Sequence, residues 1–230
     1  PWRGRPRPRH HTGSTDRPVA LHAQSCMTER EAFAARFDVS RETLAQFDTY
    51  AAMLGDWQTR MNLVGPSTLP HVWERHFTDS AQLLSLAGTG RSWLDIGAGA
   101  GFPGLVLAVI DPDARLTLVE SIAKKCRFLS EVVIALGLDS RVTIENRRIE
   151  TLPRAKFDII TARALAALGQ LFDWGLPYAG SGTHWILPKG ARVDEELEKA
   201  SRRFAFEHRL VPSITDADAR IVVARGVKHR

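Results

Sequence analysis

Apolar residues in the first third of the chain recur at intervals of three and four, the spacing that gives a helix one buried face. Ser40 is of a residue type that caps helix N-termini, and the positions that keep the spacing after it are Leu44, Phe47, Ala51 and Leu54. We therefore predict an amphipathic helix from Ser40 to about Asn62. The Gly65-Pro66 turn follows, and a second helix is predicted over roughly Leu69–Leu86.

The pattern changes after residue 90, where short apolar stretches alternate with helical ones. The predicted strands are Ser92–Ile96, Arg115–Glu120, Arg141–Glu145, Phe157–Ala162, Thr183–Pro188, Phe206–Val211 and Arg220–Ala224, with a charged helix near Asp194–Phe204. Alternating strands and helices indicate a mostly parallel sheet with helices on both faces. We therefore predict an α/β fold: a doubly wound, Rossmann-like sheet over residues 89–230, preceded by a helical extension over residues 27–88.

Residues 1–26 differ in composition from the rest of the chain. They hold four prolines, five arginines against one aspartate, and no helical or strand periodicity. We predict a disordered basic tail or, because folding signals begin just after Met27, an upstream extension that is not native. These residues carry most of the net charge of +5, so the remainder is close to neutral and total charge alone does not indicate nucleic-acid binding.

Composition excludes several classes of protein. With 44% hydrophobic and 25% charged residues the chain is neither wholly disordered nor collagen-like nor a coiled coil. No apolar run approaches the roughly 18 residues that span a bilayer. Cys26 and Cys126 lack metal-ligand spacing and cannot form a disulfide scaffold. We expect a cytoplasmic monomer that uses no metal and contacts no membrane.

The strongest local signal is the segment Trp93-Leu-Asp-Ile-Gly-Ala-Gly-Ala-Gly-Phe-Pro-Gly104. A strand is predicted to end at Ile96, and the glycines that follow, beginning with Gly97 and Gly99, allow a tight turn that a ligand can approach closely. This is the first strand-to-helix turn of a doubly wound sheet, where nucleotide-like ligands bind. Glu120 ends the next predicted strand, where a carboxylate accepts hydrogen bonds from ribose hydroxyls.

Two nucleotide-like cofactors compete for this loop. Gly99-Ala-Gly-Phe-Pro-Gly104 matches the dinucleotide fingerprint, but the match starts two residues late relative to the strand end. Asp95 beside the loop would repel a pyrophosphate, whereas S-adenosylmethionine has no phosphate and offers an ammonium and a sulfonium group. The pattern D-x-G-x-G-x-G therefore favours S-adenosylmethionine over NAD.

Several segments of the chain resemble the RsmG (GidB) family, bacterial methyltransferases that modify guanine N7 in small-subunit (16S) ribosomal RNA. The matching segments are Asn62–Val64, Arg75-His-Phe-Thr-Asp-Ser80, Leu94–Gly104, Glu120–Leu129, Arg148-Ile-Glu150, Phe157–Ala164 and Lys189-Gly190. The Arg-His-x-x-Asp-Ser segment and the Phe-Pro-Gly ending of the glycine loop are the most specific of them. The resemblance implies a class I, S-adenosylmethionine-dependent rRNA methyltransferase, whose partner is ribosomal RNA or the ribosomal subunit.

The same resemblance implies roles for single residues. The resemblance implies cofactor contacts at Gly97, Phe102, Ile149, Glu150 and Arg163. The loop pattern discussed above adds Asp95, Gly99 and Glu120 to the expected cofactor contacts. Ile149 and Glu150 would hold the adenine end. Substrate would be positioned by Arg163, Arg75, His76 and Lys189. No general base is expected, because guanine N7 carries a lone pair and no proton.

Other interpretations stay open at this point. A salt bridge with Asp158, Asp95 or Glu150 would also explain a partly buried Arg163. Lys124 and Arg127 share a helix face that is either a phosphate-contact patch or simply solvated. Two other functions also fit: methyl transfer to a protein or small molecule, and NAD-dependent oxidoreduction or cofactor binding without catalysis.

Overall fold

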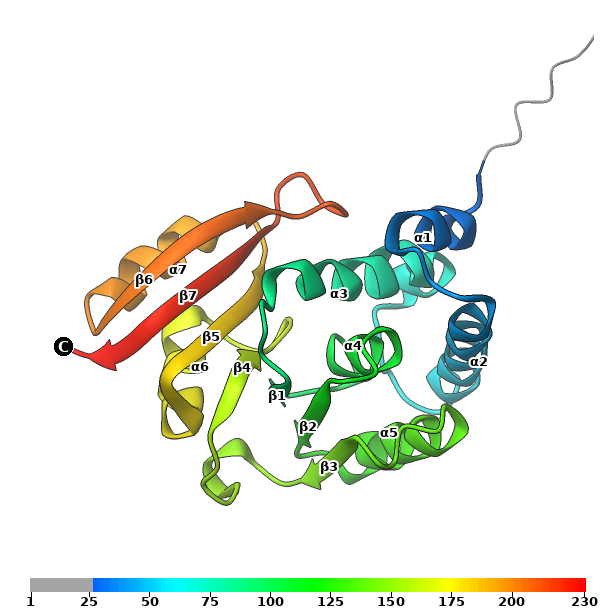
Figure 1. Cartoon of the computed structure of the whole chain (residues 1–230), viewed down its shortest axis with the longest axis horizontal. Helices are drawn as coiled ribbons and strands as arrows, with labels where there is room; N and C mark the ends of the chain where they lie inside the picture. The colour runs from blue at the N-terminus through cyan, green and yellow to red at the C-terminus, as the bar shows by residue number, and fades with distance from the viewer. Residues whose placement is uncertain (1–26) are drawn as a thin grey trace, which may run out of the picture.

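The computed structural model describes residues 27–230, which contain a seven-stranded sheet in the order β3-β2-β1-β4-β5-β7-β6 (Figure 1). The strands are β1 (Ser92–Ile96), β2 (Arg115–Glu120), β3 (Val142–Asn146), β4 (Phe157–Thr161), β5 (Ala179–Lys189), β6 (Phe204–Pro212) and β7 (Arg220–His229). Strands β1 to β5 are parallel, and β7 is antiparallel to both β5 and β6. The expected doubly wound α/β fold is confirmed.

The strand order reverses at β1, which lies between β2 and β4. After β1 the chain moves outward through β2 to β3, and it then returns to the other side of β1 to form β4. In open sheets of this kind the loops at the carboxyl ends of the two central strands separate and leave a crevice. The loop after Ile96 and the loop after Thr161 flank this crevice.

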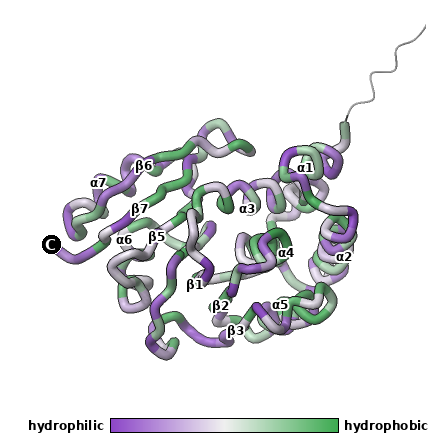
Figure 2. Tube along the Cα trace, viewed as in Figure 1, coloured by the Kyte–Doolittle hydropathy of each residue, from purple (hydrophilic) through white to green (hydrophobic). Residues whose placement is uncertain are grey.

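Helices cover both faces of the sheet. One face packs against α4 (Gly104–Ile110) and α5 (Ala123–Ala135), and the other against α6 (Leu168–Gly175) and α7 (Val193–Ser201) (Figure 1). Successive residues of a strand point to opposite faces of the sheet. On β1, Trp93 packs into the core that contains α4, and Leu94 packs into the core that contains α6. Figure 2 shows α4 as predominantly hydrophobic, consistent with its burial between the sheet and the N-terminal helices.

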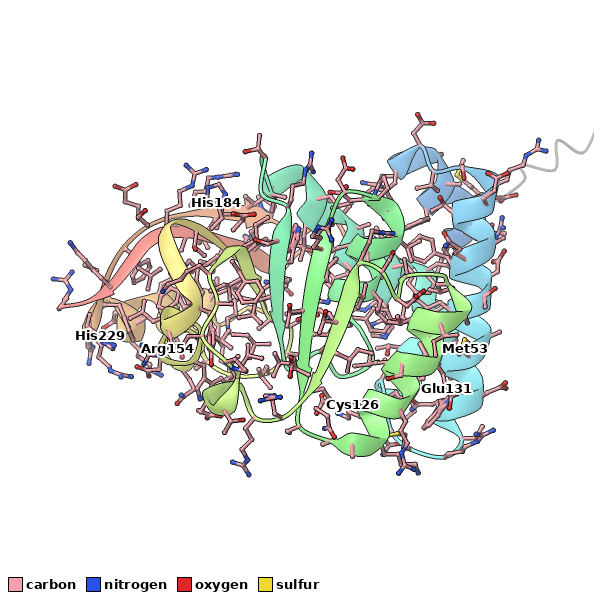
Figure 3. The ribbon with its side chains drawn as sticks, turned by 60° about the horizontal axis from the view of Figure 1, so that its bottom comes forward. Met53, Cys126, Glu131, Arg154, His184 and His229 are labelled. Carbon is pink, nitrogen blue, oxygen red and sulfur yellow. The ribbon has the colours of Figure 1, made fainter. Side chains whose placement is uncertain are left out.

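The N-terminal extension lies outside α4 and α5 and begins with α1 (Glu29–Phe37) and α2 (Arg41–Gln58). Phe33 and Phe47 meet with their ring centroids 5.0 Å apart, and both rings are buried. Figure 3 shows Met53 on α2 and Glu131 on the facing helix α5. The indole of Trp57 donates a hydrogen bond to the Glu131 carboxylate at 3.0 Å. The extension is therefore packed onto the sheet domain and shares its core.

Residues 66–86 form the second predicted helix, but its geometry is irregular. A 3-10 stretch (Pro66–His71) leads into a π-helical turn (Trp73–Thr78), then α3 (Asp79–Ala81) and a second 3-10 stretch (Gln82–Leu86). In the π turn the Asp79 N–H reaches back to the carbonyl of Glu74. Such turns are frequent at functional sites because they rotate side chains out of the ordinary helical register.

Some boundaries differ from the prediction. Helix α1 was not expected, because its nine residues carry only a weak apolar face. Phe204 begins β6 instead of ending the charged helix, and β5 starts at Ala179, four residues before the predicted strand Thr183–Pro188. The prediction for residues 1–26 falls outside the described residues. Within residues 27–230 there is no helix with the length and apolarity needed to cross a membrane.

Candidate active site

A cavity of about 1130 Å³ opens above the carboxyl ends of β1 and β4. Its walls come from the glycine loop after β1, the residues after β2 and β3, the loop after β4, the segment 63–79 of the N-terminal extension, and the loop between β6 and β7. This is the crevice that a doubly wound sheet offers to ligands. The cavity is large enough for a nucleoside-sized cofactor with space left for a second reactant.

The glycine loop needs its glycines for backbone geometry. Gly97, Gly99 and Gly101 all have positive φ angles, of 72°, 58° and 90°. A side chain at Gly97 would in addition come within 2.7 Å of Leu165. The loop therefore keeps its backbone open to the cavity, and any L residue at these positions would be strained.

The N–H groups of this loop are largely used inside the protein. Those of Gly97 and Ala98 donate to the Val119 carbonyl, and those of Gly101 and Leu105 to carbonyls within the loop. The remaining donors in hydrogen bonds are Gly99, to Glu120 at 3.0 Å, and Gly104, to Asp95 at 2.9 Å. A pyrophosphate site depends on N–H groups that are free to point at the phosphates. The loop accordingly fits S-adenosylmethionine, which carries no phosphate, better than a dinucleotide.

Glu120 and Asp95 support the loop in different ways. Glu120 lies at the end of β2 and lines the cavity; its two oxygens accept from Gly99 N–H and, at 2.8 Å, from Ile122 N–H. Asp95 lies beneath the loop, fully buried, and is not part of the cavity wall. One of its oxygens accepts from Gly104, while Oδ1 has no hydrogen-bond partner among the described residues. Burial raises the pKa of Asp95 to about 7.

Ile149 and Glu150 lie on the cavity wall in a 3-10 turn after β3. The buried Tyr178 hydroxyl donates to the Ile149 carbonyl at 2.6 Å and so fixes this turn from behind. Ile149 is buried and Glu150 exposed. An apolar side chain held beside an exposed polar residue is suited to one face and one edge of a purine.

A stacked cluster around Phe102, the residue that follows Gly101 in the glycine loop, forms another part of the cavity wall. The His76 ring stacks on Phe102 with a centroid distance of 4.8 Å, and the Arg163 guanidinium lies 4.9 Å from the same ring centroid. Tyr50 stacks on Phe102 at 5.4 Å and donates a hydrogen bond to the Ala100 carbonyl. The cluster joins α2, the π turn, the glycine loop and the end of β4 in one packed unit.

Hydrogen bonds fix the protonation state of His76. Arg163 Nη2 lies 2.9 Å from His76 Nδ1, and because a guanidinium can only donate, Nδ1 must accept. The ring proton is then on Nε2, which lies 2.8 Å from the Thr68 hydroxyl. Burial, reinforced by Arg163 and Arg75, lowers the pKa of His76 to about 3. His76 is thus a neutral ring whose acceptor nitrogen is already occupied.

The loop after β4 is held at both ends. Arg163 donates to Asp79 at 3.0 Å, and Lys189 Nζ donates to the Ala166 carbonyl at 2.6 Å while pairing with Glu196 at 2.8 Å. Between these anchors Ala164 has a positive φ of 52°, and Leu165 turns an apolar side chain that is 42% exposed toward the glycine loop. Leu165 therefore forms an apolar part of the cavity wall.

The structure brings most of the expected residues together, with Asp95 behind the wall. Arg163 does form a salt bridge, but with Asp79 and with none of the three carboxylates considered as alternatives, Asp158, Asp95 and Glu150. Asp158 instead accepts from Arg91 and Ser92 at the far end of β1. The positioning role expected of Arg163 stays a prediction. Lys189 is directed at the loop after β4 instead of lying free in the cavity, with its side chain 7% exposed. Arg75 lies 3.7 Å from Asp216.

Sequence analysis missed several contributors: Tyr50, Thr68, Asp79, Leu165 and Glu196. Tyr50 follows Phe47 by three residues and so lies on the buried helix face, a position the analysis gave to Ala51. Asp79 stood inside the Arg-His-x-x-Asp-Ser segment without a role. The other three carry no local signal. Among residues 27–230 no cluster of histidine, cysteine, aspartate or glutamate side chains is arranged to hold a metal ion.

Comparison with known proteins gives extended sequence matches. The family described as GidB, rRNA small subunit methyltransferase G, matches residues 43–222. The chain is 48% identical over 190 residues to ribosomal RNA small subunit methyltransferase G of Methylorubrum populi, covering 80% of this chain and 89% of that protein. It is 42% identical over 207 residues to the protein of the same name from Rhizorhabdus wittichii, covering 89% and 95%.

Solved structures share the fold at low identity. A putative O-methyltransferase from Klebsiella pneumoniae aligns with a TM-score of 0.57 at 16% identity, covering 86% of this chain and 94% of that chain. A SAM-dependent O-methyltransferase from Thermotoga maritima aligns with a TM-score of 0.55 at 17% identity, covering 79% and 72%. The fold is thus that of class I methyltransferases, with helices added before β1.

Proposed function

Since the chain belongs to the GidB family of rRNA small subunit methyltransferase G, we propose that it transfers a methyl group from S-adenosylmethionine to N7 of one guanine in 16S ribosomal RNA. The observation that carries the proposal is one cavity whose wall combines two sets of residues. The turn at Gly97 and Gly99 with Glu120 forms one part of the wall, and the stacked side chains of Arg163, His76 and Phe102 form another.

The proposed cofactor contacts follow the cavity wall. Gly97 and Gly99 provide the close backbone approach, Glu120 the acceptor for ribose hydroxyls, and Ile149 with Glu150 the adenine end. Asp95 contributes from beneath, by holding the Gly104 N–H and so the shape of the loop. When bound, S-adenosylmethionine supplies an electrophilic methyl group on a sulfonium centre.

The stacked cluster of Arg163, His76 and Phe102 is where we place the guanine that accepts the methyl group, and we call it the acceptor end of the cavity. Its residues fit a reaction without a general base. His76 has a strongly lowered pKa, and its acceptor nitrogen receives a hydrogen bond from Arg163. It is therefore unable to take a proton from substrate without first losing that contact. Guanine N7 needs no such help, because its lone pair is available at neutral pH, and the task of the site is alignment and exclusion of water. A hydroxyl or amine acceptor would need a base.

The mouth of the cavity suits a ribose-phosphate chain. Three basic side chains on its wall form no ion pair with a carboxylate among the described residues: Lys125 on α5, Arg148 after β3 and Arg192 before α7. The neighbouring cations Arg147, Arg163 and Lys189 are paired. We propose that the three unpaired cations contact RNA phosphates, which a small-molecule methyltransferase would not require.

The proposed partner is ribosomal RNA, free or within the small ribosomal subunit, and a cytoplasmic monomer is the expected state of the enzyme. The first test has two measurements. Isothermal titration should detect S-adenosylhomocysteine but not NAD, and purified small subunits should accept a labelled methyl group from S-adenosylmethionine. Binding of NAD, or labelling of another macromolecule with none on the subunits, would contradict the proposal.

A further inference from the structure

The Asp79 carboxylate joins two elements that are far apart in sequence. Oδ2 accepts from Arg163 at 3.0 Å, at the acceptor end of the cavity. Oδ1 accepts from the Thr215 hydroxyl at 2.9 Å and from the Gln82 amide at 3.0 Å. The side chain is only 19% exposed, and Arg163 is its ion-pair partner among residues 27–230. One half-buried carboxylate therefore holds both Arg163 and the loop that contains Thr215.

That loop, residues 213–219 between β6 and β7, forms part of the cavity wall through Thr215, Asp216 and Ala219. Figure 1 shows it reaching from the sheet toward α3. The Gln82 side chain accepts from the Ile214 N–H at 3.0 Å and donates to the Ser213 hydroxyl at 3.2 Å. The loop is thus anchored to the helix that carries Asp79.

The charge of Asp79 also matters for the reaction. Methylation of a ring nitrogen places a positive charge on the acceptor base, and a lone guanidinium beside it would oppose that charge. At a few ångströms, in surroundings less polar than water, such a repulsion is stronger than it would be in bulk solvent. Pairing with Asp79 makes the arginine site neutral overall and fixes the guanidinium over Phe102.

We propose that Asp79 is a positioning residue that couples the loop 213–219 to Arg163, so that the wall of the acceptor site and its charge are set by one carboxylate. The proposal rests on the proposed methyl transfer for its activity measurements. Its structural half, the coupling of the loop, can be measured without any substrate.

Two near-isosteric variants separate the charge that Asp79 places opposite Arg163 from its hold on the loop 213–219. Asp79→Asn keeps the shape but removes the charge opposite Arg163; we expect kcat to fall about 10- to 100-fold, the range for one charge-assisted hydrogen bond. Thr215→Val removes the hydroxyl that donates to Asp79 and also lies 3.0 Å from the Ser213 hydroxyl within the loop. We expect KM for the ribosomal subunit to rise with a smaller change in kcat, and a Ser213→Ala variant, which loses the contact within the loop but keeps Thr215 on Asp79, should change KM less. In Asp79→Asn and Thr215→Val the affinity for S-adenosylhomocysteine should fall much less than kcat or KM changes, because neither residue has a hydrogen bond to Gly97, Gly99 or Glu120.

Hydrogen exchange measures the loop directly. The amides of residues 213–216 should exchange faster in Thr215→Val than in wild type, while those of β1 and α4 stay unchanged. Asp111→Asn is the matched control, since Asp111 also pairs with an arginine at 3.1 Å and is 18% exposed but is not part of the cavity wall. This control should keep the wild-type kcat, KM and exchange rates in the loop.

The outcomes distinguish this inference from the function it rests on. If wild type methylates subunits and Asp79→Asn does so with unchanged kcat and KM, the positioning role is wrong and the proposed function stands. Unchanged exchange at residues 213–216 in Thr215→Val overturns the coupling, whether or not methylation is detected. If wild type methylates nothing, the proposed function fails, and the exchange experiment alone decides the coupling.

Discussion

Replacing Asp95 with asparagine should change how the stability of the protein depends on pH. The Asp95 side chain is fully buried beneath the glycine loop, and only one of its oxygens has a hydrogen-bond donor, the Gly104 N–H. Burial raises the pKa of this carboxyl to about 7, from an ordinary value of 3.8. Asparagine keeps the shape and can keep the hydrogen bond from Gly104, but it does not titrate.

The sign and size follow from proton linkage. Between about pH 4 and pH 7 the folded protein binds a proton at Asp95 and the unfolded chain does not, so the stability contributed by this group is lost as the pH rises through that window. Well inside this window each pH unit lowers the free energy of unfolding by about 1.4 kcal/mol. The loss is about 2 kcal/mol between pH 5 and pH 7, because the slope falls near the folded-state pKa, and about 3 kcal/mol by pH 8. The loss ends once Asp95 is ionised in both states.

The assay is urea unfolding of wild type and Asp95→Asn, without cofactor, at several values from about pH 5 to about pH 8. The other titrating groups are the same in both proteins, so their contributions cancel in the difference between the two unfolding free energies. One of them is His76, whose lowered pKa makes the folded protein more stable as the pH rises. We expect the difference in unfolding free energy to move in favour of the variant by about 3 kcal/mol, then level off. Parallel curves for the two proteins would refute the reasoning, because Asp95 would then be ionised in the folded state throughout.

Three further predictions concern the site. Glu120→Gln should weaken S-adenosylhomocysteine binding in titration calorimetry by about 1.5–3 kcal/mol, the range for a hydrogen bond to a charged group; wild-type affinity would remove Glu120 from the cofactor site. Single-turnover methylation should be nearly flat from about pH 6 to about pH 9, since His76 stays neutral there; a log-linear rise that His76→Ala abolishes would mean a catalytic base. Alanine at each unpaired cation should make the salt dependence of RNA binding shallower by up to about one unit of slope, and unchanged slopes would argue against phosphate contacts at Lys125, Arg148 and Arg192.

Local patterns were sufficient for the sheet and for the geometry of the glycine loop. Strands β1 and β2 lie where alternating apolar segments predicted them, because each is a continuous buried stretch that ends in a turn or an acidic residue. The glycines of the loop are informative for the same reason: a positive φ is required by the local backbone alone. Such features depend on a few neighbouring residues, so they are visible in the sequence.

The contacts that shape the acceptor end depend on the fold instead. Arg163 could be assigned to the end of a strand, but its partner Asp79 comes from the N-terminal extension, 84 residues earlier in the chain. Asp158 lies at the other end of β4, beside Arg91 and Ser92. Lys189 was placed at the carboxyl end of the predicted fifth strand, yet its amino group donates to the Ala166 carbonyl and pairs with Glu196 on α7, neither of which is its neighbour in sequence. These side chains meet partners that are distant in sequence, so their pairing depends on the folded structure and not on a local pattern.

The central claim is that this protein methylates guanine N7 in 16S ribosomal RNA, and the most direct measurement combines transfer with identification of the atom. Small ribosomal subunits from cells that lack this gene are incubated with the purified protein and labelled S-adenosylmethionine, and the RNA is then reduced with borohydride and treated with aniline, which breaks the chain at N7-methylguanine. We predict incorporation of label together with one new break in the 16S RNA. Label without a break would place the methyl group on another atom, and the absence of label would contradict the account as a whole.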